Sequence, residues 1–150
     1  MDMTGEFRIP ASREAVWKAL NDPEILKQSI AGCEELTKLS DTEFVARVVA
    51  KVGPVKATFS GKVTLSDIDP PNGYKIIGEG QGGAAGFAKG GADVRLASDG
   101  AGTLLSYTVN AAIGGKLAQL GQRLINSAAK KTADDFFANF AAAVTPKMAA

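Results

Sequence analysis

The sequence predicts an α+β protein in which a curved antiparallel sheet of about seven strands wraps around a long C-terminal helix. Two observations predict this fold. From Glu34 to Ala112, apolar and polar residues alternate with a period of two, which is typical of strands that have one buried face. From about Gly115 to Val144, the apolar residues instead recur with helical spacing. A helix of this length needs a concave partner surface, and a sheet that curves around it tends to enclose a cavity.

The first 30 residues predict one strand and two short helices. The strand covers Gly5 to Pro10, and Ser12 then offers an N-cap oxygen to a helix from Arg13 to Leu20. Asp22 caps a second helix that begins at Pro23 and runs to about Ile30, because proline is favoured at the first helical position. The expected order is one strand, two helices, six strands and the long helix, all within a single domain of residues 1–150.

The middle of the chain predicts an antiparallel sheet with one buried face. In Phe44–Val52 and in Val55–Ser66, which flank the turn Gly53-Pro54, apolar residues alternate with polar ones. Strands of a parallel sheet would instead be apolar on both faces. Further turns and strands are expected at Asp69–Gly73, Tyr74–Gly82, Phe87–Ala97, Asp99–Gly102 and Thr103–Ile113.

Many of the 17 glycines cluster in the middle of the expected sheet. Glycine inside a strand marks a bend, a bulge or a place where a large group approaches the backbone. The cluster predicts strong curvature of the sheet, and contact with a ligand is a compatible alternative. It joins two strands and lacks the Gly-Lys-Ser/Thr ending of a P-loop, so it predicts no phosphate site. Its members are Gly78, Gly80, Gly82, Gly83, Gly86, Gly90 and Gly91.

The composition argues against several classes of function. The balance of 17 Lys and Arg against 16 Asp and Glu, without a basic block, argues against nucleic-acid binding. The absence of histidine removes the usual general base, the commonest metal ligand and the Ser-His or Cys-His pairs of nucleophilic catalysis. One cysteine and scattered carboxylates give no recognisable metal-ligand spacing. We therefore expect neither a metal nor a covalently attached cofactor.

The sequence predicts a cytoplasmic protein. Residues 1–6 are acidic and are not followed by the apolar stretch of a signal peptide. The lone Cys33 cannot form an intramolecular disulfide, which favours a reducing compartment and a buried structural thiol, although a reactive thiol is the alternative. No apolar run approaches the roughly 18 to 20 residues of a transmembrane helix. Any membrane contact is expected to be peripheral, at the inner face of the cytoplasmic membrane.

Six short strings carry a family resemblance. They are Leu20-Asn21-Asp22-Pro23-Glu24, Ile30-Ala31-Gly32-Cys33-Glu34, Val52-Gly53-Pro54-Val55, Asp69-Pro70-Pro71 before Tyr74, Gly86-Phe87-Ala88-Lys89-Gly90, and the run from Gly114 to Ile125. Together with the order of elements, they resemble the CoxG family of carbon monoxide dehydrogenase subunits, within the START-like, or helix-grip (SRPBCC), superfamily. The resemblance covers nearly the whole chain, and the last string is the most specific.

The resemblance implies a noncatalytic accessory protein of a molybdenum-containing carbon monoxide dehydrogenase or a related hydroxylase. Such proteins are thought to help couple the enzyme to the cytoplasmic membrane, and their hydrophobic cavity suits a quinone or another lipid-like molecule. The implied partners are the hydroxylase subunits, a hydrophobic small molecule and the membrane surface. Longer relatives extend beyond the final helix, whereas this sequence ends at Ala150. The resemblance therefore does not extend to an anchoring tail.

A cavity between the sheet and the helix would be lined almost entirely by apolar side chains. Such walls suit a hydrophobic guest, and the Tyr107 hydroxyl would orient a carbonyl by hydrogen bonding. The same side chains would also fill a solid core, and close packing explains Gly121 as well as a ligand does. Lys116 and Arg123 are expected on a solvated helix face, or to steer an acidic partner or a lipid headgroup. The candidate ligand-binding residues are Phe59, Val63, Tyr74, Ile76, Phe87, Tyr107, Leu120, Gly121, Leu124, Phe136 and Phe140.

Two other functions stay open. The superfamily includes cyclases and dehydratases, but catalysis needs a poised acid or base, and Glu79, Asp93 and Arg95 are expected to face solvent. Alternatively, the protein is an interaction module with an incidental cavity. In that case Asp134-Asp135 beside Phe136-Phe137 would form part of the docking surface, although a contact with the core explains this segment equally well.

Overall fold

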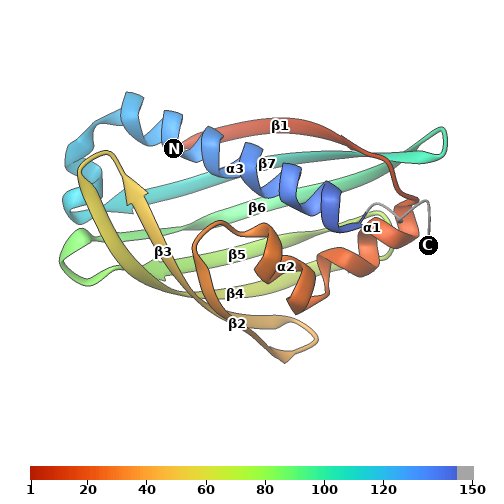
Figure 1. Cartoon of the computed structure of the whole chain (residues 1–150), viewed down its shortest axis with the longest axis horizontal. Coiled ribbons are helices and arrows are strands. Elements are labelled where there is room, and N and C mark those ends of the chain that lie inside the picture. Colours follow the sequence, from red (N-terminus) through yellow and green to blue (C-terminus); the bar gives the residue numbers. More distant parts are fainter. Residues whose placement is uncertain (145–150) are drawn as a thin grey trace.

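In the computed structural model, which describes residues 1–144, a single antiparallel sheet curves around the C-terminal helix (Figure 1). The strand order β1-β7-β6-β5-β4-β3-β2 makes β2 to β7 a continuous meander, with β1 added beside β7. This arrangement confirms the predicted fold class. The elements are β1 (Asp2–Ile9), α1 (Arg13–Leu20), α2 (Pro23–Ser29), β2 (Cys33–Ser40), β3 (Glu43–Val52), β4 (Val55–Asp69), β5 (Gly73–Gln81), the 3-10 helix η1 (Gly83–Ala85), β6 (Phe87–Asp99), β7 (Gly102–Gly114), the 3-10 helix η2 (Gly115–Leu120) and α3 (Gln122–Val144).

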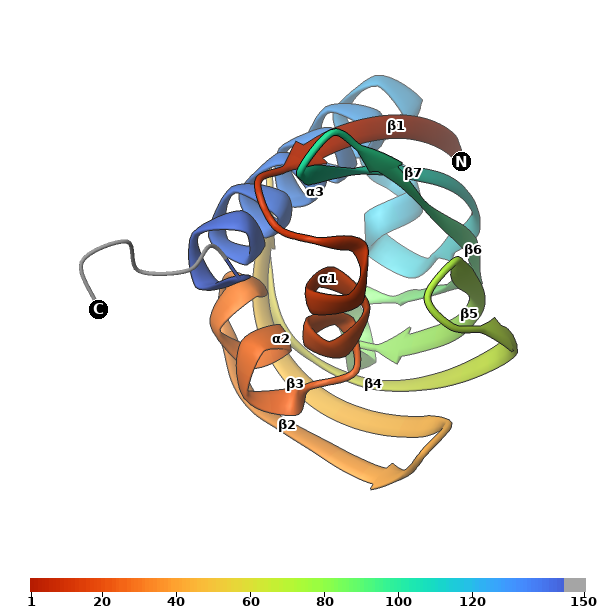
Figure 2. The same cartoon turned by 90° about the vertical axis from the view of Figure 1, so that its right-hand side faces the viewer.

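The two short helices begin where their capping residues predict. The Ser12 hydroxyl accepts a hydrogen bond from the Ala15 amide at 3.2 Å, and the Asp22 carboxylate accepts one from the Glu24 amide at 3.0 Å. Seen end-on, the sheet forms a trough whose open side is occupied by α3 and α2, while α1 lies across its near end (Figure 2).

β1 begins three residues earlier than predicted. Asp2 has low strand propensity, but it pairs with Asn110 of β7, as Thr4 does with Thr108. The backbone carbonyl of Met1 also accepts a hydrogen bond from the Ala111 amide at 2.8 Å. Pairing with a long neighbouring strand therefore outweighs local propensity at this edge of the sheet.

The long helix is shorter than predicted, because Gly121 interrupts it. The run from Gly115 to Leu120 forms η2, and Gly121 adopts a φ of 91°, in the left-handed region that favours glycine. Helix α3 then begins at Gln122, and the Ile125 amide donates to the Gly121 carbonyl at 3.1 Å. The apolar residues of η2 therefore do not continue the buried face of α3.

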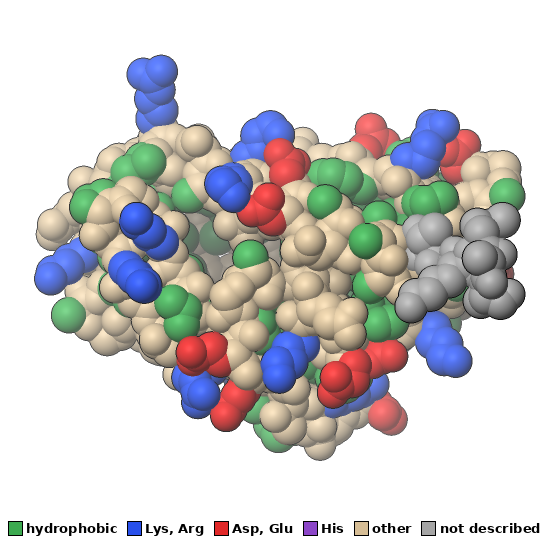
Figure 3. Space-filling model, viewed as in Figure 1, with side chains coloured by type: hydrophobic (Ala, Val, Ile, Leu, Met, Phe, Trp, Pro, Cys, Tyr) green, Lys and Arg blue, Asp and Glu red, His purple; other side chains and the backbone are tan. Residues whose placement is uncertain are grey.

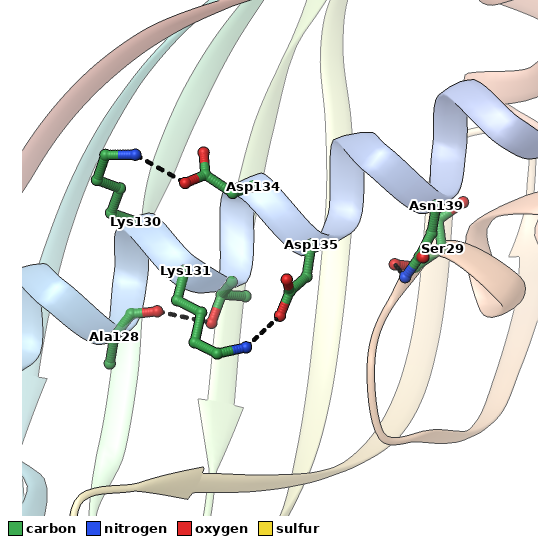
Figure 4. Close-up of polar contacts among 8 residues, drawn as sticks. Ser29, Ala128, Lys130, Lys131, Asp134, Asp135 and Asn139 are labelled. Atoms are coloured by element: carbon green, nitrogen blue, oxygen red, sulfur yellow. Dashed lines mark hydrogen bonds and ion pairs between the residues drawn. The ribbon is translucent and has the colours of Figure 1, made fainter.

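The hydrophobic core lies at the end of the trough that α1 closes. Ile9, Leu105 and Phe140 are fully buried there. The ring of Phe137 stacks on Phe7, with 4.4 Å between the ring centroids. The Asn139 side chain of α3 donates to the Ser29 carbonyl of α2 at 3.3 Å, which ties the two helices together (Figure 4).

The outer face of α3 carries two ion pairs. Lys130 lies 2.7 Å from Asp134, and Lys131 lies 2.7 Å from Asp135 (Figure 4). Both pairs are spaced by one helical turn, and on an exposed helix face such pairs contribute little to stability because water screens them. The acidic pair at 134–135 is thus already matched by lysines of its own helix.

Candidate ligand-binding site

Small residues form two neighbouring rows across the concave face of the sheet. The backbone register places inward-facing residues of adjacent strands side by side, because alternate residues of a strand face the same way. All members of the two rows are half-buried, although they face the interior of the trough. One row is Gly78, Gly90 and Ala111, and the next is Ala46, Gly61, Gly80 and Ala88.

A hollow opens to the surface in this half of the molecule. Figure 3 shows it between α3, β3 and the segment that joins α2 to β2. Two aromatic rings lie along its wall. The Phe59 ring occupies the place where a Cβ of Gly82 would be, and the Tyr107 ring does the same at Gly5. Each ring therefore lies against the backbone of a glycine, Gly82 just after β5 and Gly5 in β1.

The first half of α3 covers the hollow without sealing it. Ile125, Ala129 and Ala133 are only half-buried, and Phe137, which is 9% exposed, is the first buried residue of α3. Leu124 is 37% exposed and touches the tip of the β3–β4 hairpin, where a Cβ on Gly53 would lie 2.8 Å from its Cδ2. The hairpin tip and the first turn of α3 therefore form one rim of the hollow.

Tyr107 supplies a polar group on the β1 side of α3. It also lines a crevice of about 360 Å³ between β1 and α3, together with Asn126, Lys130 and Asp134. Burial raises the pKa of the Tyr107 hydroxyl, and the negative charge of Asp134 raises it further. At neutral pH the hydroxyl is therefore protonated and can donate a hydrogen bond. The two rows of small residues contain no titratable side chain.

Five of the candidate lining residues lie together on the inner side of the molecule. All five are half-buried, and all but Phe59 pack against the edge of the core, where the core meets the hollow. They are Phe59, Val63, Ile76, Tyr107 and Phe136. Tyr74 and Phe140 lie inside the core itself, with exposures of 4% and 0%. The Tyr74 hydroxyl donates to the Leu20 carbonyl at 3.4 Å, which holds it away from the hollow.

Phe87 lies on the outer face of the sheet. It has the same orientation as Lys89 and Asp93, it is 39% exposed, and its ring covers Gly114. The sequence prediction placed it inside because alternation cannot be counted through η1, where the backbone leaves the strand geometry. Leu120 is half-buried in η2, Gly121 is exposed, and Leu124 lies on the rim.

Sequence reasoning missed the residues that make the hollow. The glycines of β5, Gly78 and Gly80, were interpreted as markers of curvature, with ligand contact as a compatible alternative, but they were not among the candidate lining residues, and neither were Gly61 and Ile125. The signal was present, because each inward glycine alternates with an outward residue such as Glu79.

The charged residues of β5 and β6 lie where the sequence predicts. Glu79, Asp93 and Arg95 are on the outer face of the sheet, and Arg95 pairs with Asp93 at 3.0 Å. They are therefore separated from the hollow by the sheet itself.

Cys33 is half-buried rather than fully buried. Burial raises the pKa of its thiol, and the sulfur donates to the Glu35 carbonyl at 3.3 Å. A raised pKa disfavours the thiolate, which is the reactive form. The contacts of Cys33 are thus those of a structural residue.

The family assignment follows from the sequence match. Residues 5–145 match the CoxG family of carbon monoxide dehydrogenase subunits. The chain belongs to this family. No curated protein matches the sequence.

Solved structures show the same fold over nearly the whole chain. A conserved protein from Geobacillus kaustophilus is 31% identical, with a TM-score of 0.90 over 96% of this chain and 95% of that one. A START superfamily protein from Mycobacterium smegmatis is 14% identical, with a TM-score of 0.72 over 95% and 96% of the two chains. The ZhuI aromatase/cyclase from Streptomyces sp. R1128 is 12% identical, with a TM-score of 0.65 over 96% and 93%. The last two similarities show the START-like fold alone.

Membership of the CoxG family and the START-like fold suggest a ligand-binding accessory protein. Within residues 1–144, no helix is both long and apolar enough to span a bilayer. The same residues contain no group of three or more side chains suited to holding a metal ion.

Proposed function

We propose that this member of the CoxG family is a noncatalytic accessory protein that binds a quinone or another lipid-like molecule in the hollow beneath α3. In this proposal it serves a molybdenum-containing carbon monoxide dehydrogenase or a related hydroxylase and helps couple that enzyme to the membrane. The observation that carries the proposal is the pair of glycine and alanine rows, which place no bulky side chain opposite α3 and in which a Cβ at Gly80 would meet no atom within 4 Å.

The free energy of binding would come mainly from apolar burial. A planar ring of the size of an aromatic side chain buries roughly 150–250 Å², which contributes about 4–6 kcal/mol at about 25 cal/mol per Å² before the costs of association. Each buried methylene of an attached tail adds about 0.8 kcal/mol. The protonated Tyr107 hydroxyl would hydrogen-bond a carbonyl oxygen and so orient the guest.

The noncatalytic role is supported by the chemistry of the hollow. An enzyme of the cyclase or dehydratase type needs an acid or a base that faces the reacting atoms. The rows beneath α3 provide neither, and the raised pKa of Tyr107 makes it a hydrogen-bond donor rather than a base near neutral pH. The carboxylates of β5 and β6, Glu79 and Asp93, lie on the other face of the sheet.

Gly80→Leu tests the location of the site. A Cβ at Gly80 would meet no atom within 4 Å, and its φ lies outside the left-handed region, so a leucine would project into free space. Glu79→Leu is the matched control, since it adds the same side chain to the outer face of the same strand. Thermal unfolding of both variants verifies that they fold.

The measurement is the binding of a short-tailed quinone by isothermal titration calorimetry, with native mass spectrometry of the gently isolated protein to detect a copurified ligand. We expect the wild-type protein and Glu79→Leu to bind the quinone equally, and Gly80→Leu to bind it at least roughly tenfold more weakly, because the leucine takes up the space of several methylene groups. A wild-type protein that neither copurifies with a lipid or quinone nor binds the added quinone contradicts the proposal. If Gly80→Leu binds the quinone as tightly as the wild-type protein does, the site lies elsewhere.

A further inference from the structure

One end of the molecule carries basic side chains without acidic neighbours. The β3–β4 hairpin, η1, η2 and the first turn of α3 meet at this end. The three segments that reach it, residues 44–66, 80–92 and 100–133, contain no Asp or Glu, although the whole chain has nearly equal numbers of acidic and basic residues. Figure 3 shows Lys and Arg side chains gathered at the left end of the view, with no acidic side chain among them.

We define the basic pole as Lys51, Lys56, Lys116 and Arg123, all of which are exposed. Within the described residues, none of the four takes part in an ion pair. Other lysines are matched by carboxylates, as in the pairs Lys62–Glu43 at 3.2 Å and Lys75–Asp67 at 3.5 Å, although Lys38 and Lys89 also take part in none of the ion pairs among the described residues. The charge at this end is therefore uncompensated.

The positions of two lysines in the β3–β4 hairpin destabilise the protein when no partner is bound. Lys51 and Lys56 are direct partners across the β3–β4 ladder, and like charges directly opposite each other destabilise a strand pair. A polyanionic surface placed against the hairpin would remove this repulsion. The pair therefore points to an anionic partner.

Exposed apolar side chains lie beside these charges. Leu124 follows Arg123 in the first turn of α3, is 37% exposed and touches the hairpin tip at Gly53, and the next residue of the tip, Pro54, is also exposed. Cations that surround a small apolar protrusion match the interface of a bilayer, where headgroups attract the cations and the acyl boundary accepts the apolar group.

The hollow opens next to the basic pole. Its mouth borders β3, and the contact of Leu124 with the hairpin tip forms its rim. A hydrophobic ligand that leaves the hollow at this rim would emerge among the residues of the pole. An acidic protein would neutralise the basic pole equally well. It would not explain why the exposed apolar side chains and the mouth of the hollow lie beside the pole.

We infer that the basic pole docks on a lipid bilayer that contains anionic headgroups, with Leu124 and the hairpin tip directed into the interface. The inference rests on the proposed function for its purpose, namely transfer of a hydrophobic ligand between bilayer and hollow. Vesicle binding and quinone binding are separate experiments, so the inference and the proposed function can fail independently of each other.

Flotation with phosphatidylcholine vesicles, with and without phosphatidylglycerol, tests the inference. The wild-type protein should float only with the anionic vesicles, and less so as salt is added. Each basic residue near an anionic surface contributes roughly fivefold to partitioning, so Lys51→Gln/Lys56→Gln should bind roughly 25-fold more weakly. Lys18→Gln/Lys27→Gln is the matched control, because it removes the same charge from exposed positions of α1 and α2. Leu124→Ala should also bind more weakly, without any change in charge.

Several outcomes would overturn the inference. They are absence of wild-type binding to anionic vesicles, unchanged binding of Lys51→Gln/Lys56→Gln, and an equal loss in the control. If Lys51→Gln/Lys56→Gln keeps vesicle binding but no longer captures the purified dehydrogenase, the pole is a protein-docking surface instead. Binding of a short-tailed quinone in solution tests the proposed function separately. If the wild-type protein binds vesicles but not the quinone, the proposed ligand is wrong and the docking surface is still supported.

Discussion

The two halves of the trough share one sheet and one helix but differ in the size of their inward residues. At the α1 end, the sheet contributes large buried side chains such as Leu65, Tyr74 and Leu105. At the other end, the same strands contribute half-buried residues such as Gly80 and Ala88. The alternation of the strands continues unchanged through both halves, so side-chain size alone separates a packed core from a hollow.

Helix α3 repeats this difference along its length. Its second half buries Phe137 and Phe140, whereas its first half presents Ile125, Ala129 and Ala133 to the hollow. Packing at one end holds the helix on the sheet, and the other end is thereby free to cover an unfilled space. The comparison implies that most of the stability comes from the α1 end, whereas the proposed ligand site lies at the other.

The largest expected effect is at the packed end. Phe140→Ala should lower the free energy of unfolding by about 3–5 kcal/mol, because it removes a fully buried aromatic ring and leaves a cavity. Urea denaturation followed by circular dichroism measures it. Ile125→Ala, which shortens a half-buried side chain over the hollow, should cost about 1 kcal/mol or less. Equal losses in the two variants would mean that the hollow end is as well packed as the core.

The element order and much of the packed end were predictable from the sequence. The caps at Ser12 and Asp22 fix the starts of both short helices, and the alternation in β3 and β4 fixes their inward faces. These features are local, since each depends on residues within a few positions of one another. Local patterns survive folding when tertiary contacts agree with them.

The hollow was less predictable because it depends on register between strands. That Gly80 lies beside Gly61 and Ala88 follows from the pairing of β4, β5 and β6, and no single strand reveals it. The interruption at Gly121 and the outward face of Phe87 were missed for a related reason. Each depends on a 3-10 turn that shifts the counting of residues, and such turns leave no periodic signal.

The second prediction concerns alkaline pH and separates the two tyrosines of the chain. Burial raises the pKa of the Tyr74 hydroxyl at the packed end. Because the folded-state pKa lies above the unfolded value of about 10, the neutral hydroxyl contributes stability that is complete below about pH 10 and is lost as the pH rises towards the folded-state pKa. The loss is at most about 1.4 kcal/mol per pH unit.

Urea denaturation between neutral pH and the alkaline limit of folding measures this slope. Tyr74→Phe should flatten it, whereas Tyr107→Phe should change it less, because Tyr107 is only half-buried. Lysines that titrate in the same range are common to all three proteins, so the differences between them isolate each tyrosine. If Tyr107→Phe flattened the pH dependence of stability more than Tyr74→Phe does, the more deeply buried tyrosine would lie at the hollow end, contrary to the comparison above.

The smallest expected effect is a gain of stability at the hollow. A Cβ added at Gly80 meets no atom within 4 Å, so Gly80→Ala restricts the unfolded chain without straining the folded one and should raise the free energy of unfolding by about 0.4–1 kcal/mol. At the packed end of the same strand, a Cβ added at Gly73 would collide with the Val94 carbonyl oxygen, and Gly73→Ala should destabilise the protein. Urea denaturation of both variants measures whether each substitution raises or lowers the free energy of unfolding. If Gly80→Ala also destabilised the protein, the space beneath α3 would already be occupied by the packed chain, and a hydrophobic guest would have nowhere to bind.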